Sequence, residues 1–274
     1  MVLITGCSSG IGRATALRLA KAGHTVYATA RRLESVKDLE DQGCRTLSLD
    51  VTDPASAAAA VAAVQDAHGS VEALVNNAGY GQSGAVEAVP IDDIRRQFET
   101  NVLGYIRMAQ LVLPAMRGAG RGRIVNLSSV AGRVVMPGSG IYSSSKFAIE
   151  AFSDALRYEV RAFGIDVVVV EPGPIRTSFT GTANVGFPEI AAGQPYGNFH
   201  EAVAASDAEA DHSKLAGDAD EVAAVIQKAV EARHPKPRYR VKFVARFLPA
   251  LRATLPDRAW DAFLKTQVPP PKPE

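Results

Sequence analysis

The chain has 274 residues, of which 47% are hydrophobic and 22% charged, and its formal net charge is +1. This composition suits one globular domain with a full core, and the balanced charge excludes the broad positive field that recruits nucleic acid. Two cysteines, Cys7 and Cys44, exclude a disulfide framework, and the scattered histidines lack the spacing of a metal site.

Short apolar runs alternate with longer amphipathic stretches. In chain order, we expect a strand at residues 2–5, a helix at 10–22, a strand at 25–30, a charged helix at 33–42, a strand at 45–49, a helix at 53–68, a strand at 71–76, a long helical region at 91–116, a strand at 123–127, a helix at 142–163, a strand at 165–170, a helix at 220–232 and a strand at 238–243. The alternation predicts an α/β fold in one domain spanning 1–274, with a parallel sheet of about seven strands and helices on both faces.

Two segments interrupt this alternation. Residues 178–216 mix glycine, proline and acidic residues with the aromatic residues Phe179, Phe187, Tyr196 and Phe199. We expect this segment to be a long substrate loop or lid. Residues 243–274 form a C-terminal extension, and its proline-rich end is expected to be disordered.

The C-terminal extension carries apolar residues at helical spacing. They are Val244, Phe247, Leu248, Leu251 and Leu255, with Lys242, Arg246 and Arg252 beside them. Pro249 interrupts this pattern. We interpret the segment as packed over the cleft or on a partner subunit, with peripheral membrane contact as the alternative. No apolar run reaches the ~18 residues of a transmembrane span and no signal peptide is recognisable, so we expect a cytoplasmic protein.

A glycine-rich turn joins the first expected strand to the first expected helix. Residues 5–12 read Thr-Gly-Cys-Ser-Ser-Gly-Ile-Gly, which places glycines at 6, 10 and 12. Such a turn lets a pyrophosphate approach the backbone, and the helix N-terminus offers it unpaired N–H groups and a partial positive charge. The turn therefore predicts a dinucleotide site, the alternative being a turn without a ligand. We interpret Cys7 as a packed small thiol, with a reactive thiol as the alternative.

The end of the second expected strand bears on the cofactor. A ribose 2′-hydroxyl is usually held there by an acidic residue, whereas a 2′-phosphate needs a cation. This chain has Arg31 and Arg32 and no acid at that point. Because arginine presents a planar fork suited to phosphate, Arg31 favours NADP(H) over NAD(H). The alternative is that both arginines merely begin a solvated helix.

Tyr142 and Lys146 lie four residues apart in an expected helix, and Ser129 precedes the tyrosine by thirteen residues. Residues i and i+4 of a helix share one face, so the ammonium group would lie close to the phenol. A nearby positive charge favours the phenolate and lowers the pKa of tyrosine, which makes it a usable general acid or base. Ser129 could orient a carbonyl or alcohol oxygen. The alternative is two surface residues on one helical turn.

These motifs together resemble the short-chain dehydrogenase/reductase family in its single-domain form, over about residues 2–177. Four further segments resemble the family's pattern, namely 49–51, 76–79, 100–104 and 172–177. The resemblance implies a Rossmann-type doubly wound sheet. It implies cofactor contacts from Gly6, Ser8, Gly10, Ile11, Gly12, Arg31, Asp50, Val51, Asn77, Ala78, Gly79, Tyr142, Lys146, Pro172, Gly173, Ile175 and Thr177.

The resemblance also implies a catalytic set of Asn101, Ser129, Tyr142 and Lys146. Tyr142 would exchange a proton with the substrate oxygen, to which Ser129 would hydrogen-bond. Lys146 would bind the nicotinamide ribose and lower the pKa of the tyrosine, and Asn101 would support a water that links Lys146 to solvent. Ser128 is an alternative to Ser129, but the thirteen-residue spacing favours Ser129.

The resulting prediction is an NADP(H)-dependent oxidoreductase acting on a lipophilic alcohol or ketone, in a homodimer or homotetramer. The apolar residues expected around the substrate are Val135, Met136, Phe179, Phe187 and Phe199. Local patterns resemble members of the family that act on hydroxysteroids or retinoids. One rival is a catalytically silent dinucleotide-binding sensor or scaffold. A nucleotide-sugar epimerase is a second rival, but its glycine spacing and larger C-terminal domain are missing here.

Overall fold

The computed structural model describes residues 1–176, 195–213 and 215–271. Within these residues, seven parallel strands form the central sheet in the order β3-β2-β1-β4-β5-β6-β9. The strands are β1 (Val2–Ile4), β2 (Val26–Ala30), β3 (Arg45–Ser48), β4 (Ala73–Asn76), β5 (Gly122–Leu127), β6 (Ile165–Pro172) and β9 (Arg238–Val241). The predicted parallel sheet, doubly wound and of Rossmann type, is confirmed.

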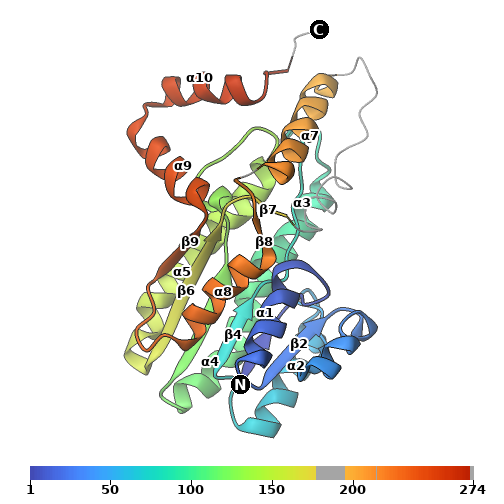
Figure 1. Ribbon diagram of the computed structural model, residues 1–274, viewed down its shortest axis with the longest axis vertical. Helices are drawn as coiled ribbons and strands as arrows, with labels where there is room; N and C mark the ends of the chain where they lie inside the picture. The colour runs from blue at the N-terminus through green and yellow to red at the C-terminus, as the bar shows by residue number, and fades with distance from the viewer. Residues whose placement is uncertain (177–194, 214, 272–274) are drawn as a thin grey trace.

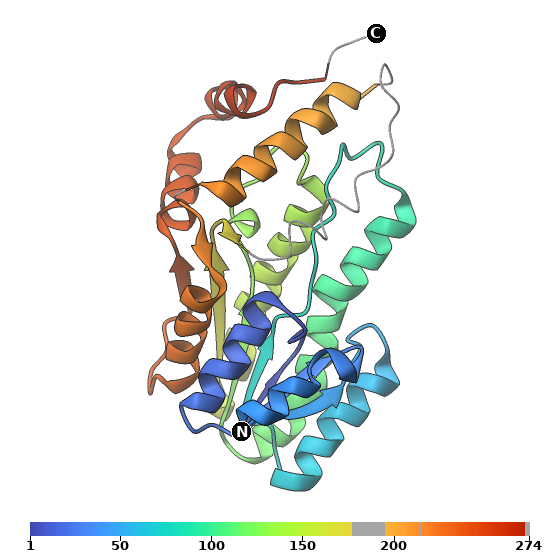
Figure 2. The same ribbon diagram turned by 45° about the vertical axis from the view of Figure 1, so that its right-hand side comes forward.

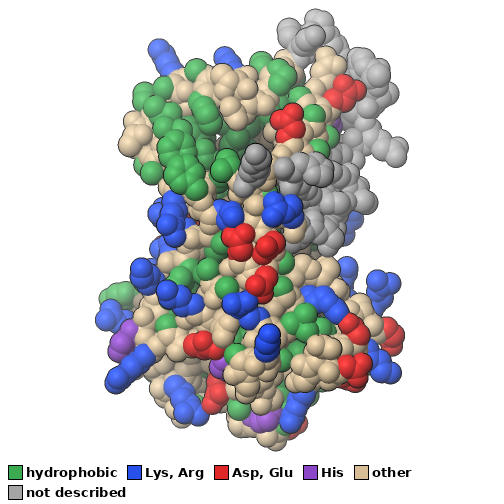
Figure 3. All heavy atoms as spheres, viewed as in Figure 1, with side chains coloured by type: hydrophobic (Ala, Val, Ile, Leu, Met, Phe, Trp, Pro, Cys, Tyr) green, Lys and Arg blue, Asp and Glu red, His purple; other side chains and the backbone are tan. Residues whose placement is uncertain are grey.

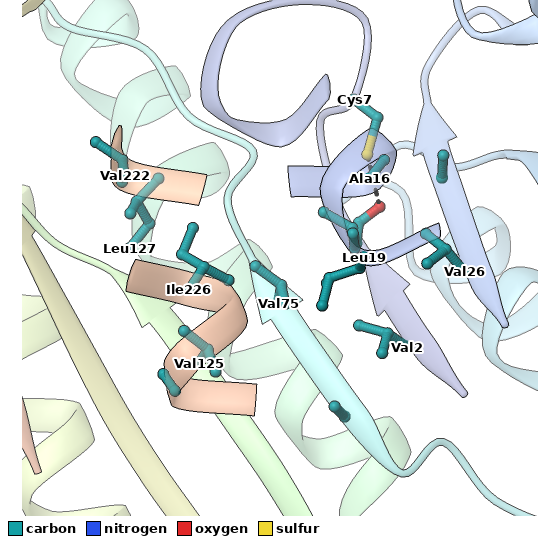
Figure 4. Close-up of a cluster of buried hydrophobic side chains, with 14 of the residues drawn as sticks. Val2, Cys7, Ala16, Leu19, Val26, Val75, Val125, Leu127, Val222 and Ile226 are labelled. Atoms are coloured by element: carbon teal, nitrogen blue, oxygen red, sulfur yellow. Dashed lines mark hydrogen bonds between the residues drawn. The ribbon is translucent and has the colours of Figure 1, made fainter. Parts of the chain in front are cut away.

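Helices cover both faces of the sheet because the central strands β1, β2, β4, β5 and β6 are buried along nearly their whole length. Val2 and Ile4 face α1 (Gly10–Lys21) and α8 (Ala219–Glu231), whereas Leu3 between them faces the opposite layer. That layer contains α2 (Pro54–His68), α4 (Gly104–Gly118) and α5 (Gly140–Val160). Figure 1 shows α1 and α8 side by side across one face, and Figure 4 shows the apolar cluster beneath them, including Leu19 and Ile226.

The sheet order changes direction between β1 and β4, whose carboxyl ends lie next to each other. From β1, the next strands β2 and β3 are added toward one edge of the sheet. From β4, the next strands β5 and β6 are added toward the opposite edge. In open parallel sheets, the crevice beyond such a switch point is where ligands bind. The glycine turn and the segment after β4 both lie at this place.

Two predicted helices differ in detail from the structure. The segment expected as one helix at 33–42 forms two 3₁₀-helices, η1 (Leu33–Ser35) and η2 (Lys37–Gln42). Its fully buried residues are Val36 and Leu39, which are three residues apart and so match the 3₁₀ period. The long region at 91–116 is α3 (Ile91–Phe98), a π-helical turn η3 (Glu99–Leu103) and α4.

The described part of 178–216 is mainly helical and not an irregular loop. Helix α7 (Gly197–His212) follows residues outside the described ranges, which include Phe179 and Phe187. The short strands β7 (Ile175–Arg176) and β8 (Gly217–Asp218) pair on either side of the segment. His200 Nε2 accepts from the Ala85 N–H at 2.8 Å, which fastens α7 to the loop after β4.

The C-terminal extension forms α9 (Phe243–Thr254) and α10 (Asp257–Gln267). Pro249 lies inside α9, so the prediction that it interrupts the helix is wrong. A proline removes one backbone donor, and burial of Ala245 against the rest of the protein holds the helix in place.

Figures 1 and 2 show α7, α9 and α10 together beyond the carboxyl ends of the strands. No helix in the described residues is long and apolar enough to cross a membrane.

Candidate active site

Side-chain hydrogen bonds of Thr5 and Asn77 fasten the glycine turn to the end of β4. The Thr5 hydroxyl accepts from the N–H groups of Asn77 and Ala78, both at 3.0 Å. The Asn77 side-chain amide donates to the carbonyls of Thr5 and Gly6, both at 2.9 Å. Asn77 therefore shapes the turn as well as lining the crevice.

The turn has no room for side chains at Gly6 and Gly12. A Cβ on Gly12 would lie 2.3 Å from the Gly6 oxygen, and Gly6 has φ of +74°, where a side chain is strained. The first turn of α1 holds no acidic residue, and the N-cap Ser9 makes no side-chain capping bond. A pyrophosphate therefore fits at this helix N-terminus by charge and by access to the backbone.

Burial decides between the two interpretations of Cys7. The thiol is fully buried and donates to the Ile4 carbonyl at 3.4 Å. Burial raises the pKa of Cys7 to about 12, the largest of several effects. A thiol in that state is a packing residue and a poor nucleophile.

The adjoining strand ends supply Arg31 and Asp50. Arg31 is exposed and lines the crevice, and no ion pair between described residues involves it. The Asp50 carboxylate accepts from the Thr52 N–H at 2.9 Å and from the Thr52 hydroxyl at 2.7 Å. One exposed guanidinium and one oriented carboxylate thus lie at this end of the crevice.

Helix α5 and the 3₁₀ turn η4 (Val130–Gly132) bring the three predicted catalytic side chains together. Ser129 caps η4 by accepting from the Ala131 N–H at 3.1 Å, and it hydrogen-bonds to Tyr142. Lys146 is 4% exposed, and its ammonium group donates to the Leu127 carbonyl at 2.8 Å. Its Nζ lies 5.8 Å from the centre of the Tyr142 ring.

Burial dominates the electrostatics of this group. It raises the pKa of Tyr142 to about 12, although the hydrogen bond with Ser129 acts in the opposite direction. Burial lowers the pKa of Lys146 to about 8, and the charge of Glu150 opposes this. The prediction that Lys146 gives Tyr142 a lowered pKa is therefore wrong for this arrangement, because removal from water is the largest effect on the phenol and the effect that lowers its pKa comes from Ser129.

Asn101 lies in the π-helical turn η3 and is completely buried. Its amide nitrogen donates to the Tyr80 carbonyl at 2.8 Å and to the Ser145 hydroxyl at 3.2 Å, and its oxygen accepts from the Tyr80 N–H at 3.1 Å. Asn101 thus links the segment after β4 to α5. Because the bulge of η3 orients it, the pattern of a regular helix could not have placed it.

A crevice of about 970 Å³ connects these groups. Most of the predicted site residues line it: Gly6, Ser8, Gly10, Ile11, Arg31, Asp50, Val51, Asn77, Ala78, Gly79, Ser129, Tyr142, Lys146, Pro172, Gly173 and Ile175. Gly12 and Asn101 instead pack beneath its walls, and Thr177 lies outside the described residues.

The part of the expected apolar wall that the structure describes does not line this crevice, and Phe179 and Phe187 lie outside the described residues. Among the described residues, Val135, Met136 and Phe199 do not line it, whereas Asp207 of α7 does. Thr52, Tyr80 and Arg96 line it and were missed. Thr52 and Tyr80 directly follow the segments 49–51 and 76–79, which resemble the family's pattern, so their position in the sequence could have indicated them. No sequence signal indicated Arg96, because α3 reaches the crevice only through tertiary packing.

Comparison with known proteins agrees with this geometry. The family model described as short chain dehydrogenase matches residues 1–186. The chain belongs to the short-chain dehydrogenase/reductase family. This dehydrogenase is 43% identical over 186 residues to a 3-ketodihydrosphingosine reductase of Bacteroides thetaiotaomicron, with 68% of this chain and 67% of the relative covered.

Two relatives match this dehydrogenase over nearly its full length. An NADPH-dependent 3-dehydrocapnine reductase of Ornithobacterium rhinotracheale is 34% identical over 271 residues, 94% of each chain. Human 17-beta-hydroxysteroid dehydrogenase type 1 is 37% identical over 278 residues, 94% of this chain and 81% of the human one. The predicted family is confirmed, and the family's chemistry is oxidoreduction.

Solved structures confirm the fold. A short-chain dehydrogenase from Streptomyces avermitilis aligns with a TM-score of 0.78 at 34% identity and covers 97% of both chains. A short chain dehydrogenase/reductase from Burkholderia phymatum in complex with NAD aligns with a TM-score of 0.77 at 28% identity, covering 100% of this chain and 97% of the other.

Proposed function

We propose that this dehydrogenase transfers hydride between NADP(H) and a lipophilic alcohol or ketone, with Tyr142 as general acid and base. One observation carries the proposal. Ser129, Tyr142 and Lys146 line the same crevice as the glycine turn and Arg31. A dinucleotide laid along that crevice would bring its two ends to these two groups of residues.

The protein's own part in the reaction is to bind, orient and move a proton. The bound cofactor would supply the hydride. With a pKa of about 12, Tyr142 is protonated at neutral pH and ready to donate to a ketone oxygen in the reductive direction. Ser129 would hold that oxygen beside the phenol, and Lys146 would hold the ribose hydroxyls. Asn101 would support a water toward Lys146.

The backbone of the segment after β6 would complete the cofactor site. Pro172, Gly173 and Ile175 line the crevice, and we propose that Ile175 and Thr177 grip the carboxamide. Gly6, Ser8, Gly10 and Ile11 would cradle the pyrophosphate, with Gly12 keeping the turn tight. Asp50 and Val51 would lie against the adenine, and Asn77 to Gly79 along the ribose.

The choice of NADP(H) depends on Arg31. Its exposed guanidinium at the end of β2, where no acidic side chain is present, suits a 2′-phosphate. The NADPH-dependent relative supports this choice, whereas the NAD complex of the Burkholderia structure keeps NAD(H) as the alternative. Arg31→Ala is expected to weaken NADPH binding far more than NADH binding, and equal losses would reverse the assignment.

The lipophilic substrate class is supported by the relatives. Their names refer to a ketodihydrosphingosine and a hydroxysteroid, both largely hydrocarbon molecules with an oxygen function. Turnover should be tested by NADPH oxidation with long-chain and steroidal ketones. Tyr142→Phe should lose activity by about 10²–10⁴-fold and still bind cofactor. Cofactor binding without turnover by the wild type on any ketone of the panel would favour the silent sensor instead.

A homodimer or homotetramer is proposed from exposed apolar side chains on neighbouring helices. Leu103, Phe147 and Phe163 are each more than two-fifths exposed, around α4 and α5. Symmetric association would bury them. Light scattering of the wild type and of Phe147→Glu measures this, since the charged variant should shift the protein toward the monomer.

The outer face of α9 supports the peripheral membrane contact. Phe243 and Phe247 are 64% and 47% exposed and stack at 5.2 Å, and Figure 3 shows hydrophobic side chains gathered over α9 and α10. The helix carries Arg246 and Arg252 and no acidic residue, which suits an anionic bilayer. Sedimentation with phosphatidylglycerol vesicles should be reduced in the double variant Phe243→Ala/Phe247→Ala. Tyr158→Ala, an exposed aromatic outside α9 and outside the residues proposed for the subunit interface, is the control.

A further inference from the structure

Charged side chains from three elements meet one helical turn beyond Lys146. Arg238 of β9 donates through Nε to Glu150 of α5 at 3.0 Å and through Nη2 to Asp154 at 2.7 Å. The same Nε lies 3.2 Å from Glu171 of β6, whose second oxygen accepts from Arg240 at 2.8 Å. Glu171 is completely buried and the Glu150 side chain is 8% exposed.

Buried carboxylates of this kind need a reason to stay ionised. Burial raises the pKa of Glu150 and the charge of Glu171 adds to this, whereas Ser128 and Arg238 lower it. An isolated buried carboxylate would avoid its charge by taking up a proton. Arg238 therefore acts against protonation of Glu150, and it does so from the last strand of the sheet.

Glu150 in turn acts on Lys146. The two residues are four apart on α5 and both are buried, so they share the inward face of the helix. The 3₁₀ turn η4 covers this place closely, because a Cβ on Gly132 would lie 3.1 Å from the Lys146 carbonyl and 3.2 Å from Glu150 Cγ. With water excluded, a charge one helical turn away acts more strongly than it would at a surface.

Lys146 has few other sources of charge compensation. Its ammonium group makes its hydrogen bond to the Leu127 carbonyl and contacts the rings of Tyr142 and of Tyr105 from α4. Among the described residues no carboxylate forms an ion pair with it, and Glu150 is the neighbour whose charge favours its protonated form. The remaining charged groups around the pair are all joined to Glu150 through the network: Asp154, Arg157, Glu171, Arg238 and Arg240.

We propose that Glu150 is a positioning residue that keeps Lys146 cationic, and that Arg238 keeps Glu150 ionised for this purpose. The proposal rests on the proposed function, in which the Lys146 ammonium binds the cofactor ribose. It gives the edge strand β9 a part in the chemistry of the site, although β9 contributes no residue to the crevice wall. Without the Glu150 charge, Lys146 would lose its proton at a lower pH.

The test is the dissociation constant of NADPH as a function of pH, measured by nicotinamide fluorescence. In the wild type, affinity should fall as pH rises through the pKa of Lys146, about 8. Glu150→Gln keeps the size of the side chain and removes its charge. Its midpoint should move to lower pH by about one unit, the order expected for a charge one turn away. At pH 6 its affinity should stay within about two-fold of the wild type.

Three further variants separate a charge effect from a structural one. Glu150→Asp keeps the charge and should keep the wild-type midpoint. Arg238→Gln changes only β9 and leaves the sequence of α5 intact, and it should also move the midpoint to lower pH. Glu159→Gln, an exposed carboxylate on the same helix, should change nothing. If Glu150→Gln fails to fold, Arg238→Gln still decides the question.

The outcomes distinguish the two levels of the proposal. If Glu150→Gln and Arg238→Gln lower the melting temperature but leave the midpoint where it is, the network is structural and the inference is overturned. The same conclusion follows if the wild type binds NADPH with no midpoint between pH 7 and 10. If the wild type binds neither NADPH nor NADH at any pH, the proposed function itself fails, and this inference with it.

Discussion

Replacement of Asn77 by alanine tests whether the glycine turn depends on a side chain from β4. The Asn77 amide donates to two carbonyls, those of Thr5 and Gly6, both at 2.9 Å. Losing a partner leaves each carbonyl with a penalty of about 1–3 kcal/mol. Because the site is only partly buried, we expect a total loss of about 2–4 kcal/mol. For a domain of this size, that lowers the melting temperature by roughly 4–8 °C.

The assay for Asn77→Ala combines thermal unfolding with NADPH titration. A loosened turn must be ordered when the pyrophosphate binds, so affinity should fall by about ten-fold, equivalent to about 1.4 kcal/mol. Asn77→Asp should be at least as damaging, because a carboxylate would face two carbonyl oxygens. The control is Asn198→Ala, which removes an exposed amide on α7. A melting temperature for Asn77→Ala within a degree or so of the wild type would refute the reasoning.

Further predictions concern packing and protonation. Gly12→Ala should prevent folding or cost more than about 3 kcal/mol, because its Cβ would overlap the Gly6 carbonyl; soluble expression and urea unfolding measure this. Cys7 should not react with a thiol reagent until the protein unfolds, since its pKa is raised to about 12, and rapid labelling of the native protein would contradict this. In the cofactor-free protein, Lys146 should contribute a gain of about 2–3 kcal/mol in stability between pH 8 and 10, which Cys7 and Tyr142 partly oppose because their native pKa values are raised to about 12. Over that range the unfolded chain keeps the proton that Lys146 loses on folding, so stability rises with pH. The gain is measured as the difference between the wild type and Lys146→Met in urea unfolding at each pH, and a difference that stays constant from pH 8 to 10 would count against the lowered pKa.

The sequence predicted what depends on local pattern. The strands are short apolar runs, and the glycine turn has a spacing that few other structures require. Tyr142 and Lys146 share a face because any helix brings i and i+4 together. These features need no knowledge of distant residues, and the structure places them as expected around one crevice.

Prediction failed where distant residues decide the outcome. The pKa of Tyr142 depends on how completely the surrounding elements exclude water, which no local pattern reports. The π-helical turn that orients Asn101 is one residue out of phase with a regular helix and leaves no clear trace in the periodicity. The sequence predicts a loop where α7 lies, because glycine and acidic residues obscure the weak apolar pattern of this helix.

The partners of Glu150 were also out of reach of sequence reasoning. Arg238 follows Glu150 by 88 residues, and the sequence predicts no more than a strand at 238–243. Only the pairing of β9 beside β6 brings both arginines to the buried carboxylates. Topology therefore supplied what neither segment indicates alone.

The position of β9 at the edge of the sheet has a consequence for the newly made polypeptide. At about 5–20 residues per second, the ribosome adds Arg238 roughly 4–18 s after Glu150, because 88 residues separate them. In the later part of that interval, after β6 has been made and before β9 follows, β6 is a bare edge whose Glu171 has no arginine to meet, and such an edge can pair with another chain. Translation of β9 thus completes the sheet and pairs the buried Glu171 with arginine.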